Sequence, residues 1–302
     1  MDNPLRNIAK RLLVPLAEKA AHSYVAGPEL EDALRVCRQF SENHIGSSVC
    51  YWNELEAHPR QVADNYVQAV DALASESLDC YISIKAPPLK FDSDLLTEIV
   101  DHSQARNVCV HFDSIREEDT DKTFSLIDTM LPRYRNLGCT LPGRWQRSLK
   151  DADWATQRHL HIRVVKGQWP DSAQSEGDLR TGFLEVIDRL AGRGCRVGVA
   201  THDPLLAREA LTRLAKSGTP CELELLFGLP ARSVLYVGSD LGVPVRFYVP
   251  YGKAWLPYAL SQMSRNPRLF WWFVRDLFAD RTPVRIKRHK ASAEMAHDSR
   301  RA

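Results

Sequence analysis

Eight short apolar segments recur along the chain at intervals of roughly 20–40 residues, which is typical of strands that alternate with helices. Most are rich in Val, Ile, Cys and aromatic residues, as buried strands are. They span residues 46–52, 80–86, 107–113, 138–143, 161–167, 195–202, 221–228 and 243–252. This rhythm constrains the fold more than any other feature, because each segment predicts one strand of a repeating unit.

Helical stretches follow these segments. The predicted helices span residues 62–75, 93–102, 119–134, 151–158, 178–192, 203–217, 230–241 and 255–265. Ser93 and Asp203 are expected N-caps, and Pro204 suits the first position of a helix. Eight strand–helix units with no leftover sheet edge favour a closed (β/α)8 barrel of the TIM type over an open, doubly wound α/β sheet.

The chain divides into three predicted parts. Residues 1–36 form an amphipathic helical segment that is expected to pack against the barrel or cap its bottom. The barrel spans residues 37–275, and residues 276–302 form a basic extension without apolar periodicity. We expect the last dozen residues of this extension to be disordered, with a functional basic arm as the alternative.

Composition excludes several classes of protein. A length of 302 residues suits one barrel of about 250 residues with extensions. The net charge of +2 gives no reason to expect nucleic acid as a partner. No run approaches the roughly 18 apolar residues of a membrane span, and no signal peptide is evident. Seven cysteines without a CxxC pair indicate a reduced, cytoplasmic protein, with peripheral attachment to the inner face of a membrane as the alternative.

Glycine-rich and metal-ligand motifs are also missing from the sequence. No GxGxxG follows a predicted strand, which argues against a nicotinamide-binding domain. No HExxH or paired His and carboxylate spacing predicts a metal site.

Polar residues end several of the predicted strands, where barrel enzymes carry their chemistry. Lys85 and Asp113 end the second and third strands, and a buried ion pair is one interpretation of them. Arg163 lies in the fifth strand, and Lys166 must lie on the turn beyond it, beside Gly167, where a cation fits a phosphate. The other strand-end candidates are Thr201, His202, Tyr248 and Tyr251. For His202, a satisfied core histidine is the competing interpretation.

Four of these segments resemble the proline dehydrogenase family. Residues 163–169, Arg-Val-Val-Lys-Gly-Gln-Trp, are similar to the family's Arg-Leu-Val-Lys-Gly-Ala-Tyr, and residues 200–203 to its Ala-Thr-His-Asn. Residues 222–228 are similar to Glu-Phe-Gln-x-Leu-Tyr-Gly, and residues 245–252 to the family's eighth strand. The resemblance covers about residues 20–270, and its fifth, sixth and eighth strands are the specific part.

The resemblance implies an oxidoreductase with non-covalent FAD. Its implied cofactor residues are Arg163, Val165, Lys166, Gly167, Trp169, Thr201, His202 and Asp203. Its implied catalytic residues are Lys85, Asp113, Arg163, Tyr248 and Tyr258. Hydride would pass from the carbon next to the substrate nitrogen to the flavin, leaving an imine, and a quinone or another acceptor would take the electrons.

The chain departs from the family in its last helix, which normally reads Tyr-x-x-Arg-Arg-x-x-Glu. Here Tyr258 is followed by Ser261, Gln262 and Arg265 on one predicted helical face. The two arginines that grip a substrate carboxylate are gone. Each charged hydrogen bond is worth about 1.5–3 kcal/mol, so free proline should be a poor substrate. These three residues and Leu226 are the expected determinants of substrate specificity.

Three further departures touch the implied flavin site. Pro142 takes the place of a Gln, Trp169 that of a Tyr, and Asp203 that of an Asn. Asp203 adds a negative charge near the phosphates unless it serves only as a helix cap.

Three hypotheses follow. In the first, the substrate is an amine or cyclic imino compound whose carboxylate is masked, as in an ester, an amide or a carrier-tethered prolyl group. In the second, Arg265 grips the carboxylate and the chain is a genuine L-proline dehydrogenase. In the third, the barrel has lost catalysis and serves as a binding or partner subunit.

Overall fold

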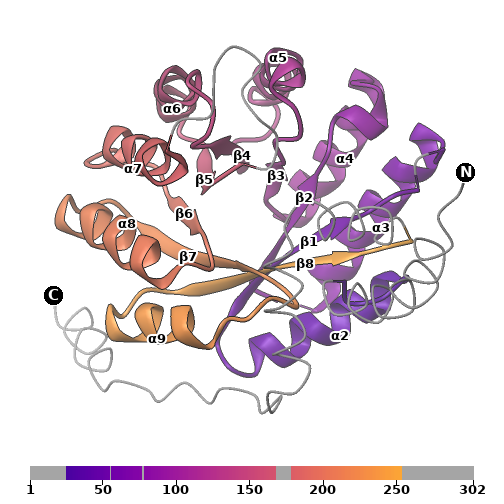
Figure 1. Cartoon of the computed structure of the whole chain (residues 1–302). Helices are drawn as coiled ribbons and strands as arrows, with labels where there is room; N and C mark the ends of the chain where they lie inside the picture. Colours follow the sequence, from indigo (N-terminus) through magenta and orange to yellow (C-terminus); the bar gives the residue numbers. More distant parts are fainter. Residues whose placement is uncertain (1–24, 55, 77, 168–177, 254–302) are drawn as a thin grey trace, which may run out of the picture.

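The computed structural model describes residues 25–54, 56–76, 78–167 and 178–253 (Figure 1). Eight parallel strands in these ranges close into a barrel in chain order. They are β1 (Gly46–Tyr51), β2 (Cys80–Ile84), β3 (Val110–Phe112), β4 (Leu137–Pro142), β5 (His161–Val165), β6 (Val197–Ala200), β7 (Cys221–Leu226) and β8 (Val245–Tyr251). Each predicted segment overlaps one strand, β4 begins one residue before its predicted segment, and the predicted (β/α)8 barrel is confirmed.

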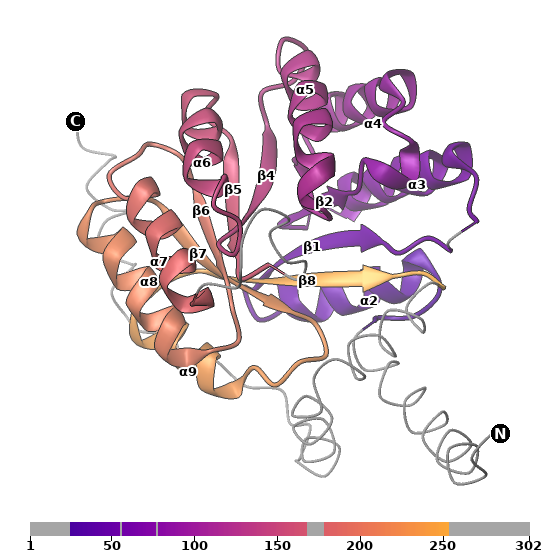
Figure 2. The same ribbon diagram turned by 45° about the horizontal axis from the view of Figure 1, so that its top comes forward.

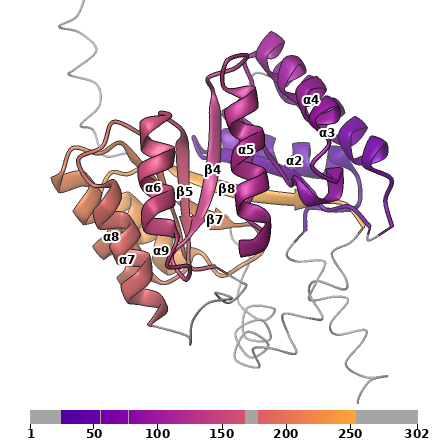
Figure 3. The same ribbon diagram turned by 90° about the horizontal axis from the view of Figure 1, so that it is seen from above.

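Helices surround the ring of strands in all three views (Figure 1, Figure 2, Figure 3). They are α2 (Leu30–Ser41), α3 (Pro59–Glu76), α4 (Ser93–Arg106), α5 (Thr120–Met130), α6 (Ser148–Gln157), α7 (Leu179–Leu190), α8 (Pro204–Lys216) and α9 (Arg232–Asp240). Short 3-10 turns, Pro87–Leu89 and Glu117–Asp119, precede α4 and α5. None of the helices in the described ranges is long and apolar enough to span a bilayer. The helix predicted for residues 255–265 lies outside the described residues.

The cap of α4 differs from the prediction. Asp92, and not Ser93, is the N-cap, because its carboxylate accepts the backbone N–H groups of Asp94 and Leu95. Ser93 is the first helical residue. Both residue types favour the cap, so residue type alone does not choose between these two adjacent positions.

Helix α2 lies beside β1 and β8 and closes that side of the barrel (Figure 2). Its buried face carries Ala33, Leu34 and Cys37. The helix continues across the predicted boundary between residues 36 and 37, so its second half belongs to the predicted barrel part. Residues 1–24 and 254–302 lie outside the described residues, and the three-part division stays a prediction. All seven cysteines are described, and none is bridged.

The barrel wall separates an apolar core from a polar one. On the outer face, residues such as Ile82, Val110 and Val164 are fully buried in the layer between strands and helices. On the inner face, hydrogen bonds join side chains of β1, β2, β5 and β7 across the barrel interior. The inner polar side chains include Ser48, Tyr81, Ser83, His111, Thr140, His161, Arg163, Glu222, Glu224, Arg246 and Tyr248.

Three strand glycines make room for the largest of these polar side chains. A Cβ atom at Gly46 would overlap the guanidinium of Arg246, and one at Gly198 would overlap the carboxylate of Glu224. A Cβ atom at Gly138 would overlap the ring of His111. Glycine weakens a strand, so its presence here marks the close approach of another group.

The crowding at Gly198 gives a test of the polar interior. Replacing Gly198 with Ala should lower the free energy of unfolding by about 1–3 kcal/mol, because the new methyl group overpacks a closed interior. Gly194→Ala is the matched control, since nothing lies within 4 Å of the position that its new methyl group would take. Urea denaturation of both variants measures the difference. Equal stability of the two would contradict the proposed packing of Glu224.

Candidate active site

A cavity of about 920 Å³ lies at the carboxyl ends of the strands. Its lining contains these predicted site residues: Lys85, Asp113, Arg163, Val165, Lys166, Gly167, Thr201, His202, Asp203, Leu226 and Tyr248. Tyr251, the other strand-end candidate, is buried away from the cavity, and its hydroxyl donates to the carbonyl of Asn65. Trp169, Tyr258, Ser261, Gln262 and Arg265 lie outside the described residues. The barrel thus brings strand ends that are far apart in sequence to one pocket, while the role of each residue stays a prediction.

Arg163 is the charged centre of this pocket, although its side chain is only 5% exposed. Its Nε donates to Glu224 Oε2 (2.5 Å), and its Nη1 donates to Asp113 Oδ1 (2.7 Å). Its Nη2 donates to the hydroxyl of Tyr81 (2.8 Å). Burial opposes the charged form, but the neighbouring Glu224 keeps the pKa of Arg163 well above its ordinary value. The guanidinium therefore stays charged and is fixed on several sides.

A second cluster joins Arg163 through Asp113. Tyr248 donates its hydroxyl proton to Asp113 Oδ2 (2.7 Å), and Lys85 Nζ lies 3.6 Å from the same oxygen. Lys85 Nζ also donates to Tyr248 Oη (3.3 Å) and to the thiol of Cys50 (2.6 Å). Burial, and then the charge of Asp113, raises the pKa of Tyr248 well above its ordinary value, so Tyr248 remains a phenol. Lys85 and Asp113 thus form the ion pair that the sequence left as an alternative, and both line the pocket.

His202 has both ring nitrogens engaged by the backbone. Its Nε2 accepts the N–H of Leu226 (2.9 Å), so Nδ1 carries the proton and donates to the carbonyl of Pro230 (2.9 Å). Burial lowers the pKa of His202, which agrees with a neutral ring. This geometry favours the satisfied core histidine over a side chain that donates to a phosphate, although the ring still lines the cavity.

Asp203 performs two roles at the start of α8. Its Oδ1 accepts the N–H groups of Leu205 (3.0 Å) and Leu206 (3.1 Å), which confirms the predicted N-cap. Its Oδ2 lies 3.6 Å from Lys166 Nζ. Partial burial opposes ionisation, but the helix N–H groups and the lysine lower the pKa of Asp203. The carboxylate of Asp203 therefore lies against the lysine and the helix N–H groups that could otherwise bind an anion at this end of the pocket.

Gly167 adopts a backbone conformation that favours glycine, with φ of 90°. A Cβ atom there would press against Pro142 and Arg144. Pro142 itself lines the cavity. Glycine at this position therefore allows the turn after Lys166 to pack closely against Pro142 and Arg144 at the edge of the pocket.

Glu224 and Tyr81 are functional candidates that the sequence analysis missed. Glu224 lines the cavity and is 1% exposed, and Tyr81 donates to its Oε1 (3.0 Å). The available signal was the pair of glutamates at alternate positions of an apolar strand, Cys-Glu-Leu-Glu-Leu-Leu. Charges on one face of a buried strand require partners, and those partners come from other strands.

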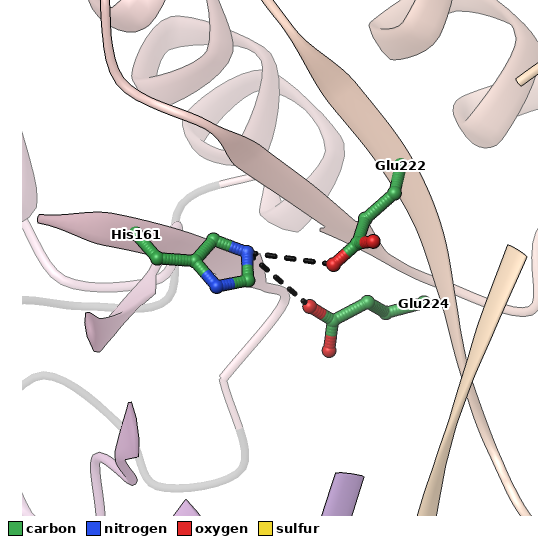
Figure 4. Close-up of side chains that lie close together, drawn as sticks. All are labelled: His161, Glu222 and Glu224. Carbon is green, nitrogen blue, oxygen red and sulfur yellow. Dashed lines mark ion pairs between the residues drawn. The ribbon is translucent and has the colours of Figure 1, made fainter. Parts of the chain in front are cut away.

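Below the pocket, His161 lies between two carboxylates (Figure 4). Its Nε2 is 3.4 Å from Glu222 Oε1 and 4.0 Å from Glu224 Oε1. These three side chains have the composition and spacing of metal ligands. However, the two oxygens of Glu222 accept from Arg246 (3.0 Å) and Arg196 (2.7 Å).

The oxygens of Glu224 are likewise engaged, by Tyr81 and Arg163. A cation at this cluster would have to displace guanidinium groups and would be repelled by those that stayed. The cluster is better explained as an ion-paired core.

Sequence comparisons find relatives over most of the chain, although no family model matches it. Proline dehydrogenase 2 of Bacillus subtilis (strain 168) is 22% identical over 265 residues, which is 82% of this chain and 87% of the relative. Proline dehydrogenase 1 of Bacillus subtilis subsp. natto is 24% identical over 263 residues, with the same coverage. Proline dehydrogenase of Deinococcus radiodurans is 22% identical over 285 residues, 87% of this chain and 90% of the relative.

Solved structures share the fold. Proline utilization A (PutA) from Bdellovibrio bacteriovorus aligns with a TM-score of 0.74 at 17% identity, over 88% of this chain. PutA from Corynebacterium freiburgense gives 0.69 at 16% identity, over 91% of this chain. The chain spans about a third of the length of each (34% and 35%). This chain is therefore similar in sequence to proline dehydrogenases over most of its length, and the solved structures share its barrel fold.

Proposed function

We propose that this protein is an FAD-dependent oxidoreductase that oxidises the C–N bond of an amine or cyclic imino substrate to an imine. The similarity to proline dehydrogenases supports the reaction class. The observation that carries the proposal is the buried, charged Arg163 on the floor of a large cavity at the strand ends. A fixed cation in such a place favours negative charge that develops in a bound group.

The described residues fit a flavin in chemistry and shape. Val165, Lys166 and Gly167 form a close wall that a planar ring could lie against, and Thr201 lines the same cavity. When bound, FAD would supply the acceptor for a hydride. Arg163 would hold a positive charge near it, and the protein's own contribution is this charge, the wall and the exclusion of water.

Asp113, Lys85 and Tyr248 would bind and orient the amine. Asp113 is fixed by Arg163 on one oxygen and by Tyr248 on the other. An ammonium substrate could donate to Asp113 Oδ2, which is where Lys85 approaches at 3.6 Å. Because a hydride leaves the carbon beside a neutral amine more readily than the carbon beside an ammonium, the ammonium would first pass a proton to the carboxylate of Asp113.

The pairing of charges supports a substrate without a free carboxylate. Each lysine and arginine that lines the cavity within the described residues lies near a carboxylate: Lys85 with Asp113, Arg163 with Asp113 and Glu224, and Lys166 with Asp203. A substrate carboxylate would compete with these internal partners and lose its hydration. Together with Ser261 and Gln262 in the sequence, this favours an ester, an amide or a carrier-tethered prolyl group.

Two other candidates remain. A genuine L-proline dehydrogenase would need Arg265, which lies outside the described residues. A non-catalytic barrel would need no flavin, and a purified protein that stayed colourless after incubation with FAD would favour it. A quinone or another acceptor would take the electrons in either catalytic case.

Dye-coupled turnover tests the choice of substrate. The unaltered protein should oxidise proline methyl ester or prolinamide with a higher kcat/KM than proline. The double variant Ser261→Arg with Gln262→Arg should raise kcat/KM for proline at least about ten-fold, because it supplies charged hydrogen bonds to the carboxylate. Ser264→Arg, which adds one positive charge off the predicted face, is the control for the charge of each arginine. Efficient proline oxidation by the unaltered protein would contradict the masked-carboxylate hypothesis.

The role of Asp203 is tested by cofactor affinity. Asp203→Asn should bind FAD several-fold more tightly, because it removes an anion from Lys166 and the α8 N-terminus while Asn still caps the helix. Riboflavin, which lacks phosphates, should bind both proteins equally. Asp178→Asn is the matched control, since Asp178 caps α7 and does not line the cavity. Flavin fluorescence quenching measures both affinities. An unchanged FAD affinity would contradict the proposal that Asp203 competes with the FAD phosphates for Lys166 and the α8 N-terminus.

A further inference from the structure

Glu224 is a charged side chain on the pocket floor that the reaction above does not use. It comes from the inner face of β7, and its Oε2 accepts Arg163 Nε while its Oε1 accepts the hydroxyl of Tyr81. Its side chain is 1% exposed, so water screens this ion pair very little. Gly198 on the neighbouring strand leaves the space into which the carboxylate fits.

The ion pairs below Glu224 leave Arg163 as its principal cationic partner. Glu222, two residues earlier on β7, is paired with Arg246 and Arg196. Arg246 also pairs with Asp79 at the exposed end of the barrel. His161 lies between the two glutamates and is 4.0 Å from Glu224 (Figure 4). The charge of Glu224 therefore acts mainly on Arg163.

Arg163 consequently carries two carboxylates, Asp113 and Glu224, on one guanidinium. Lys85 also pairs with Asp113, so Glu224 supplies the second of the two negative charges that balance Arg163 and Lys85, and without it this cluster would be positive. A positive charge near a flavin stabilises the reduced, anionic ring, and a nearby carboxylate opposes this. Because the site is buried, each charge acts strongly.

We propose that Glu224 is a positioning residue that fixes Arg163 and sets the reduction potential of the bound flavin to a lower value than Arg163 and Asp113 alone would give. The proposal rests on the proposed function, because it requires a flavin in the cavity. A lower potential makes the reduced flavin a better donor to the electron acceptor.

The decisive variant is Glu224→Gln, which keeps the shape and removes the charge. Anaerobic reduction of the holoprotein against reference dyes gives the midpoint potential of the flavin, and this potential should become more positive. Glu209→Gln is the matched control. Glu209 also pairs with two arginines, Arg180 and Arg213, but lies on α8 and does not line the cavity. The midpoint potential of the flavin should therefore be unchanged in this control variant. An unchanged potential in folded Glu224→Gln holoprotein would overturn the proposal.

Glu224→Asp is the second variant, to be measured if Glu224→Gln does not fold. The shorter aspartate retains the negative charge but holds the carboxylate farther from Arg163. The midpoint potential of the flavin should therefore become more positive, but by less than in Glu224→Gln. A potential equal to that of the unaltered holoprotein would overturn the proposal. If the unaltered protein binds no flavin, the proposed function is overturned. If it binds flavin and the midpoint potential is the same in the Glu224 variants, only this inference is overturned.

Discussion

The buried guanidinium of Arg163 is the constraint on which the barrel interior depends. Removing such a charge from water costs several kcal/mol even after relaxation, so the fold must supply partners. Asp113 and Glu224 supply charge, and the hydroxyl of Tyr81 supplies a further hydrogen bond. Gly198 exists as glycine because one of these partners needs its space. The polar side chains on the pocket floor therefore compensate the charge of Arg163, while Glu222 and Asp79 pair with the second buried cation, Arg246, deeper in the barrel.

The pairing of these buried charges with one another connects the fold to the proposed choice of substrate. Charges that neutralise one another inside the pocket give a substrate carboxylate little attraction, while an amine still meets Asp113 and Tyr248. The same holds at the far end of the cavity, where Asp203 approaches Lys166 and caps α8. The Ser261-Gln262 pair, which stands where the family has two arginines, and the paired cations in the described barrel both support the proposed change of specificity.

Much of this architecture was predictable because it follows from local patterns. Apolar rhythm predicted the eight strands and their closure, and the strand ends predicted the lining of one pocket. Asp203 as a cap followed from residue type and a following proline. Cross-barrel partnerships were not predictable, because they depend on strand register and on which strands face each other. Glu224 and Tyr81 were missed for that reason, and the engagement of His202 by Leu226 and Pro230 could not be inferred from its position.

Anaerobic single-turnover reduction of the FAD-loaded protein tests the account most directly, because it needs no electron acceptor. The account predicts that proline methyl ester bleaches the flavin absorbance band faster than free proline at equal concentration. Faster bleaching by free proline would contradict it, since a pocket whose lysines and arginines in the described ranges are paired with carboxylates should not favour a substrate carboxylate.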